Sequence, residues 1–183
     1  MTAYIKKSLP AVRQGFTLIE LLIVIAILGI LAVVILVAIN PQEQLARTRD
    51  AGRISSVTQL GHAYQAYGAS HEGDYVAETS TWITTLVLAG EVATEPGALA
   101  YTISGTAPCT SAITQNSYCY SSDGGTPPNN GIIYASLESG SNNSRCGAGE
   151  TAYTVFDTVL GRGGLVCSVG DPSYNAAGQP FIN

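Results

Sequence analysis

Gly15-Phe16-Thr17-Leu18-Ile19-Glu20 opens an apolar run that continues to Ile39 without another charged residue. From Phe16 to Ile39 the run has about 24 residues, which as an α-helix span roughly 36 Å, enough to cross a hydrocarbon core of about 30 Å. An ionised side chain in a bilayer costs roughly 2.5 to 3.5 kcal/mol, so a carboxylate there is expected to have a functional partner. The run therefore predicts a membrane-crossing helix, with Glu20 as its first candidate functional residue.

Basic residues flank this run on both sides. Lys6, Lys7 and Arg13 precede it without an acidic residue among them, which favours an N-terminus that stays in the cytoplasm. Three arginines between residues 47 and 53 follow it. Charge counting alone therefore leaves the orientation open.

Two ordinary export signals are alternatives for this segment. A secretory signal peptide has an apolar region of about 7 to 15 residues and a small-residue cleavage site after it. The present run is longer, contains Glu20 and has no A-x-A pattern directly after Ile39. A plain signal anchor explains the length but leaves the carboxylate without a purpose.

The sequence G-F-T-L-I-E followed by an apolar helix resembles the processing site and N-terminal helix of type IV pilins and their relatives, the pseudopilins. The resemblance implies that a prepilin peptidase cuts between Gly15 and Phe16, removes the leader of residues 1–15, and methylates the new N-terminus at Phe16. It also implies assembly partners, namely identical or homologous subunits in a helical filament and the assembly machinery of the inner membrane.

Cleavage would create an α-amino group at Phe16, which is largely cationic near neutral pH because its reference pKa is about 7.7 to 8.0. Glu20 lies four residues further on, so it can meet the amine of its own chain across one helical turn, or that of a staggered neighbour. Burial penalties offset much of the attraction. We therefore interpret Glu20 as a residue that selects the register of assembly.

The charge balance argues against direct binding of nucleic acids. The chain has a formal net charge of -5, which falls to -8 when Lys6, Lys7 and Arg13 leave with the leader. The arginines at positions 47, 49 and 53 are the only basic concentration, and Asp50 lies three residues from both Arg47 and Arg53. We expect solvated or intersubunit ion pairs there.

A second, amphipathic helix is predicted over residues 40–69. Asn40 reads as its N-cap, Pro41 as its first helical residue and Glu43 as a capping-box partner, so a kink or restart is expected at this point. An apolar stripe then recurs at three- and four-residue spacing and ends near Gly68. Its members are Ile54, Val57, Leu60, Tyr64 and Tyr67.

The apolar half departs from many pilins, which carry a helix-loosening proline roughly where this chain has Val37. Here the first proline after the cleavage site is Pro41. Gly29 remains as a weak point, costing about 1 kcal/mol relative to alanine within a helix. An equally good interpretation of Gly29 is that its small size lets neighbouring helices pack closely at this position.

Residues 70–183 are predicted to form a globular, β-rich head, which makes the whole chain α+β with an antiparallel sheet. A short helix is expected within Ser80–Gly90, with Trp82 or Ile83 and Leu86 facing inward. Residues 124–131 and 140–144 read as loops. The predicted strands are Leu99–Ser104, Tyr118–Ser121, Ile132–Leu137, Thr151–Val159 and Gly164–Val169.

All four cysteines lie in the head, as expected of a domain exported to an oxidising compartment. Three pairings are possible. We favour the two local pairings, Cys109 with Cys119 and Cys146 with Cys167. A zinc site is disfavoured because no C-x-x-C occurs and the histidines lie far away in sequence.

Catalytic and metal-binding patterns are weak, so we predict neither an enzyme nor a cofactor. His62 and His71 belong to no recognisable nucleophile or ligand pattern and read as solvated or structural. Asp157 and Asp171 are candidates for calcium ligation through loop oxygens, but without a dense carboxylate pattern we interpret them as surface residues.

The resemblance implies a structural subunit of a type IV pilus-like filament, serving adhesion, motility or DNA uptake. The precursor would cross the inner membrane once, with its head outside the cytoplasm, and the mature form would lie in a cell-surface filament. A pseudopilin of a type II secretion system is the first alternative. The second is a signal-anchored surface module that binds a ligand and never polymerises.

Overall fold

The computed structural model describes residues 15–101, 109 and 113–182. The chain divides into two compact units, Met1–Pro41 and Gln42–Asn183. We call the second unit the head. The predicted leader lies outside the described residues except for Gly15.

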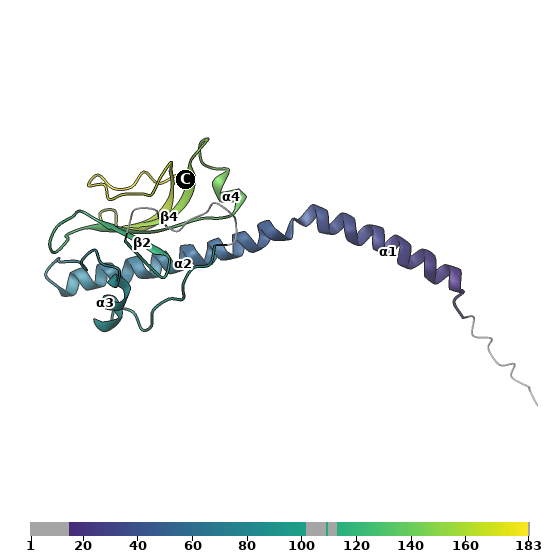
Figure 1. Cartoon of the computed structure of the whole chain (residues 1–183), viewed down its shortest axis with the longest axis horizontal. Helices are drawn as coiled ribbons and strands as arrows, with labels where there is room; N and C mark the ends of the chain where they lie inside the picture. The colour runs from purple at the N-terminus through teal and green to yellow at the C-terminus, as the bar shows by residue number, and fades with distance from the viewer. Residues whose placement is uncertain (1–14, 102–108, 110–112, 183) are drawn as a thin grey trace, which may run out of the picture. The chain divides into compact units, whose positions relative to one another are not determined.

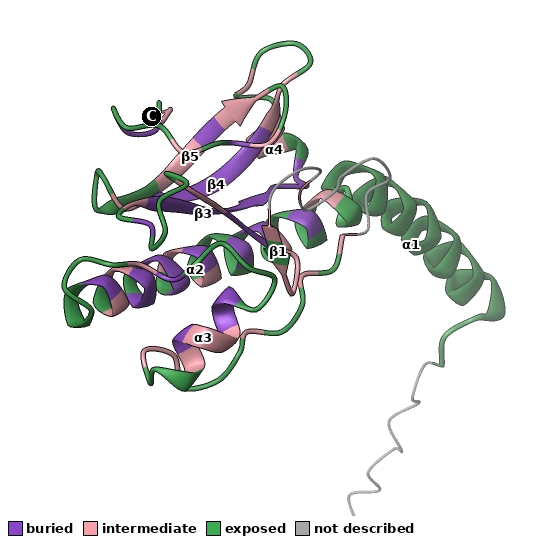
Figure 2. Cartoon of the chain, turned by 60° about the vertical axis from the view of Figure 1, so that its left-hand side comes forward, coloured by how far each residue is buried: buried purple, intermediate pink, exposed green. Residues whose placement is uncertain are grey.

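Helix α1, Leu18–Ile39, is formed by the apolar run and has no buried residue (Figure 2). It continues without interruption through Gly29, so the expected weak point shows no break. The helix ends at Asn40, whose φ of 45° places it in the left-handed region that asparagine tolerates better than most residues. The helical segment that begins at Leu18 is long and apolar enough to cross a membrane.

Helix α2, Pro41–Ser70, starts at the expected proline and ends two residues beyond the expected Gly68. Val57, Leu60 and Tyr64 are buried as the stripe predicts. Ile54, at the start of the stripe, is 40 % exposed. The large apolar side chains that α2 buries against the sheet therefore begin at Val57.

The head contains a five-stranded sheet in which every neighbouring pair is antiparallel, in the order β1-β2-β3-β4-β5 (Figure 1). This confirms the predicted α+β class. The strands are β1 Ile113–Gln115, β2 Tyr118–Ser122, β3 Gly131–Ser136, β4 Thr151–Asp157 and β5 Arg162–Ser168.

The sheet has two apolar faces because successive residues of a strand point to opposite sides. Ile133 and Phe156, opposite each other on β3 and β4, join the cluster that includes Val57 and Leu60 of α2. Tyr134 and Val155 join a second cluster, against which Phe181 of the C-terminal segment packs. Helix α2 and the C-terminal segment thus cover opposite faces of the sheet.

One strand prediction was wrong in its described part, one strand was missed, and one ends earlier than predicted. Leu99 to Tyr101 is not a strand, and 102–104 lies outside the described residues. The three-residue edge strand β1 was missed because it is too short to show alternation. Strand β4 ends at Asp157 because its carboxylate accepts hydrogen bonds from the N–H groups of Val159 and Leu160 and so starts a turn.

Two short helices complete the head. Helix α3, Trp82–Leu88, buries Trp82, Ile83 and Leu86 as predicted, and Gly90 follows it with a φ of 81°. Residues 140–144 were predicted as a loop, but Gly140–Asn143 forms helix α4, whose N-cap is Ser139.

Two disulfides join Cys109 to Cys119 and Cys146 to Cys167. These are the two local pairings that the sequence favoured. The second bond ties the segment after α4 to β5.

Candidate processing and assembly segment

The bond between Gly15 and Phe16 lies in a non-helical stretch that precedes α1. Both residues are exposed, and Phe16 is 91 % exposed. The described part of the predicted cleavage site is therefore accessible and is not held in secondary structure.

Thr17 and Glu20 form a capping box at the start of α1. The Thr17 N–H and the Thr17 hydroxyl donate to Glu20 Oε2 at 2.8 and 2.7 Å, and the Glu20 N–H donates to Thr17 Oγ1 at 3.3 Å. This role of Thr17 was not predicted. The spacing T-x-x-E, from Thr17 to Glu20, is the signal that indicates it.

The capping box holds the Glu20 carboxylate at the N-terminal end of α1, where the helix dipole favours a negative charge. The carboxylate accepts from the backbone N–H of Thr17, the residue that follows Phe16. Cleavage would expose the amine of Phe16. Among the residues that the structure describes, Glu20 Oε1 has no hydrogen-bond partner. One carboxylate oxygen thus remains available to a cation.

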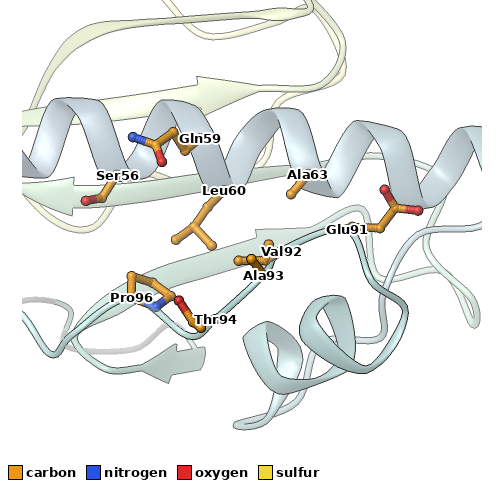
Figure 3. A pocket seen from close by; sticks show the side chains of 9 residues that line it. All are labelled: Ser56, Gln59, Leu60, Ala63, Glu91, Val92, Ala93, Thr94 and Pro96. Atoms are coloured by element: carbon orange, nitrogen blue, oxygen red, sulfur yellow. The ribbon is translucent and has the colours of Figure 1, made fainter.

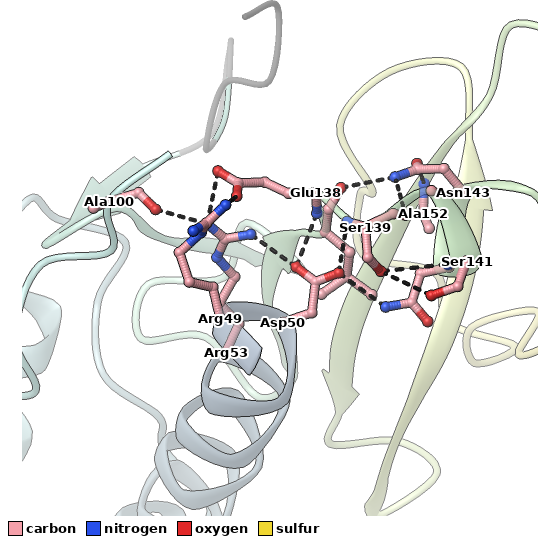
Figure 4. A network of polar contacts seen from close by, with 12 residues as sticks. Arg49, Asp50, Arg53, Ala100, Glu138, Ser139, Ser141, Asn143 and Ala152 are labelled. Carbon is pink, nitrogen blue, oxygen red and sulfur yellow. Dashed lines mark hydrogen bonds and ion pairs between the residues drawn. The ribbon is translucent and has the colours of Figure 1, made fainter. Parts of the chain in front are cut away.

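Two of the three arginines of α2, the buried Arg53 and the partly buried Arg49, belong to a polar network inside the head (Figure 4). Arg53 contacts Asp50 at 2.9 Å and Glu138 at 3.0 Å, and all three side chains are at most 2 % exposed. Arg49 contacts the same Glu138 at 2.7 Å. The expectation of solvated or intersubunit pairs is wrong for these residues, because Glu138 follows β3 and lies beside α2 only in the fold. Arg47 pairs with Glu43, not with Asp50.

Asp50 also binds the segment that leads into α4. Its carboxylate accepts from the N–H groups of Glu138 and Ser139 at 2.9 and 2.8 Å and from Asn142 Nδ2 at 2.9 Å. Burial opposes ionisation of this carboxyl, but the Ser139 side chain, followed by these backbone and amide hydrogen bonds, holds its pKa below the ordinary value.

Glu43, which was expected to cap α2, accepts from the N–H groups of Gly140 and Ser141 at 2.9 and 3.0 Å. Arg47 Nε donates to it at 3.0 Å. The N–H groups of Gly140 and Ser141 are the main reason that the pKa of Glu43 falls from 4.5 to about 2.

Replacing Glu43 with glutamine is expected to remove a pH-dependent part of the stability of the head. Because the pKa of this group is depressed in the folded state, its contribution is present above pH 4.5 and is lost as the pH falls towards 2. The stability difference between wild type and Glu43→Gln should therefore be largest near neutral pH and close to zero near pH 2. Urea unfolding followed by fluorescence of Trp82, the single tryptophan, measures it. A difference that grows in acid would contradict the assignment.

Both histidines, and Asp157 of the two calcium candidates, contact other residues of the head. The His62 ring packs edge-on against Phe156 at 5.0 Å, and the His71 ring stacks on Tyr67 at 3.8 Å. Asp157 is buried and accepts from the Gln179 N–H at 2.6 Å, so the interpretation as a surface residue is wrong for it. Within residues 15–101, 109 and 113–182, no group of three histidine, cysteine or acidic side chains is placed to hold a metal ion.

A hollow of about 340 Å³ lies between α2 and the segment 91–96 (Figure 3). Glu91 is its one charged lining residue, and the Ser70 hydroxyl donates to that carboxylate at 3.3 Å. The other lining residues are Ser56, Gln59, Leu60, Ala63, Val92, Ala93, Thr94 and Pro96.

Comparisons with known proteins point to the same N-terminal segment. Residues 11–36 match the family model of the prokaryotic N-terminal methylation motif. Comparison with curated proteins and with solved structures gives no match. The matched range contains Gly15, Phe16 and Glu20. The chain therefore carries the prepilin-type signal of the type IV pilins and pseudopilins at its N-terminus.

Proposed function

We propose that this protein is a structural subunit of a type IV pilus-like extracellular filament. A prepilin peptidase cleaves it between Gly15 and Phe16 and methylates Phe16, and the mature chain assembles through α1. The observation that carries the proposal is the combination of the methylation motif at residues 11–36 with α1, a helix of 22 residues of which none is buried.

The apolar surface of α1 explains why assembly follows extraction from a membrane. Fully burying one valine, leucine or isoleucine side chain is worth about 1.5 to 3 kcal/mol, and α1 consists almost entirely of such residues. A helix that leaves the bilayer must therefore find equivalent burial elsewhere. The α1 helices of other copies offer it, and contacts that do not close on themselves produce a fibre.

The head fits an extracellular position. Its two disulfides, Cys109–Cys119 and Cys146–Cys167, form and persist in oxidising compartments. We therefore place the precursor in the inner membrane with the head outside the cytoplasm, and the mature chain in a cell-surface filament. With a mature net charge of -8, the subunit is not expected to bind nucleic acid directly, whether the filament serves adhesion, motility or DNA uptake.

A pseudopilin of a type II secretion system is the second candidate, because the methylation motif is common to both groups. A pilus subunit should be recovered as long filaments from the sheared surface of cells. A pseudopilin should instead leave the cell surface bare at native expression levels and be required for protein secretion.

The proposal is tested by shearing cells that express the chain together with a prepilin peptidase and the assembly machinery. We expect the sheared fraction to contain filaments by electron microscopy, with this chain as a component, and we expect none in cells without the peptidase. A processed chain that stays in the membrane and is needed for secretion would support the pseudopilin. An unprocessed and monomeric chain would support the signal-anchored module and contradict both.

A further inference from the structure

Helix α2 is attached to the rest of the head in two different ways along its length. We infer that residues 42–56, the polar segment, are held by a charge clamp and open from the sheet as a unit of their own, while residues 57–68, the apolar segment, stay docked. The clamp is made of three acidic and three basic residues, Glu43, Asp50, Glu138, Arg47, Arg49 and Arg53. The inference concerns the head alone and does not depend on the proposed function.

The polar segment has almost no apolar attachment. Its buried residues are Ala46, Asp50 and Arg53, and its large apolar side chains, Leu45 and Ile54, are 60 % and 40 % exposed. It is held by the ion pairs with Glu138, by hydrogen bonds to α4 and the two residues before it, and by the hydrogen bond that Arg53 donates to the carbonyl of Ala100 at 2.7 Å. Loss of these contacts would expose little apolar surface.

The apolar segment, in contrast to the polar segment, is attached through buried apolar side chains. Val57, Leu60, Ala63 and Tyr64 belong to the main core, together with Phe156 of β4. Val57 and Tyr64 are 0 % exposed. Regions with few buried apolar contacts open at lower free energy than core elements. The boundary between the two kinds of attachment lies between Arg53 and Val57.

The clamp is close to electrically neutral, so each of its charges depends on the others. The carboxylates of Glu43, Asp50 and Glu138 face the guanidinium groups of three arginines, at positions 47, 49 and 53. Tyr101 also faces the cluster, with its ring 4.1 Å from the Arg53 guanidinium carbon. Removing one partner of a buried ion pair leaves the other uncompensated, which is far more costly than losing an exposed pair.

Glu138→Gln tests the inference, because Glu138 is the carboxylate that both Arg49 and Arg53 contact. Hydrogen exchange is measured by mass spectrometry on the full chain in detergent micelles. We expect exchange of the amides in residues 45–56 to rise at least about tenfold, while exchange in residues 58–68 changes less than about twofold. Asp74→Asn removes an exposed carboxylate of the same charge just after α2 and should leave both segments unchanged.

Two results would overturn the inference. If exchange rises equally in both segments, α2 opens as one element, and if it rises in neither, the charges do not hold the polar segment. If Glu138→Gln does not fold, Glu43→Gln, which changes a less buried carboxylate of the clamp, is used to compare amide exchange in residues 45–56 with exchange in residues 58–68. It should speed exchange in residues 45–56 only, and equal acceleration of residues 58–68 would again contradict the inference.

Discussion

Glu20→Ala is expected to abolish filament assembly while leaving cleavage between Gly15 and Phe16 intact. Glu20 carries the only charge between Phe16 and Ile39, so its loss removes the one group in that run that can pair with a buried amine. We expect the yield of sheared filaments to fall at least about 100-fold, the order of loss for an unpaired charge in a buried site. Immunoblotting of sheared and membrane fractions measures the effect.

Glu20→Gln is the matched variant that separates the charge from the capping box. Glutamine is also accepted at the third position of a capping box, so the start of α1 should be preserved. If the charge drives assembly, Glu20→Gln fails as Glu20→Ala does. Normal filaments from Glu20→Gln would show that the hydrogen bonds with Thr17 matter and that the carboxylate is not a counter-charge.

The partner of Glu20 can be identified chemically because Lys6 and Lys7 are the only lysines in the chain. After cleavage, the amine at Phe16 is the only amine left, and it stays nucleophilic when it carries one methyl group. If Glu20 pairs with the amine of a neighbouring subunit, a carbodiimide that couples carboxylates to amines should therefore join filament subunits into a covalent ladder through Phe16. If it pairs with the amine of its own chain, the new bond should form within each subunit and give no ladder. A ladder that persists in any polymers of the Glu20→Gln variant would show that another carboxylate is the partner.

Gly61→Ala is expected to destabilise the head by about 3 kcal/mol, the upper end of the usual cost of overpacking. Gly61 of α2 lies directly against the Phe156 side chain of β4. A Cβ atom there would lie 2.0 Å from Phe156 Cγ, so the helix or the aromatic ring must move. Urea unfolding of the full chain in micelles, followed by Trp82 fluorescence, measures the loss.

Gly52→Ala is the control in the same helix. Nothing lies within 4 Å of a Cβ added at Gly52, which is exposed in the polar segment. Alanine is the better helix former, so this variant should gain up to about 1 kcal/mol. If Gly61→Ala were as stable as Gly52→Ala, the close contact between α2 and Phe156 would be refuted.

Local patterns predicted the parts of the fold that depend on neighbouring residues. The apolar run gave α1, the three- and four-residue spacing gave the contacts of Val57, Leu60 and Tyr64, and the short helix around Trp82 follows from the same periodicity. The break between α1 and α2 falls at Asn40, where the asparagine-proline pair indicates it.

Most of the polar network was beyond prediction because its partners are far apart in the sequence. Asp50 and the N–H of Ser139 are separated by 89 positions, and Glu43 and the N–H of Ser141 by 98. The sequence spacing favoured local pairing of Asp50 with Arg47 and Arg53. The pair with Arg53 is confirmed, whereas the fold supplies Glu43 to Arg47. The same long-range contacts explain why residues 140–143 form α4 instead of a loop, because Glu43 binds the N–H groups at its start. The role of Thr17 was visible in the T-x-x-E spacing and was overlooked.

The central claim is that the chain is a prepilin which is processed before it assembles. Intact-mass analysis and N-terminal sequencing of the exported protein test it most directly. The account predicts a chain that begins at Phe16 and carries one additional methyl group on its terminal nitrogen. An exported chain that still contains residues 1–15 would contradict it.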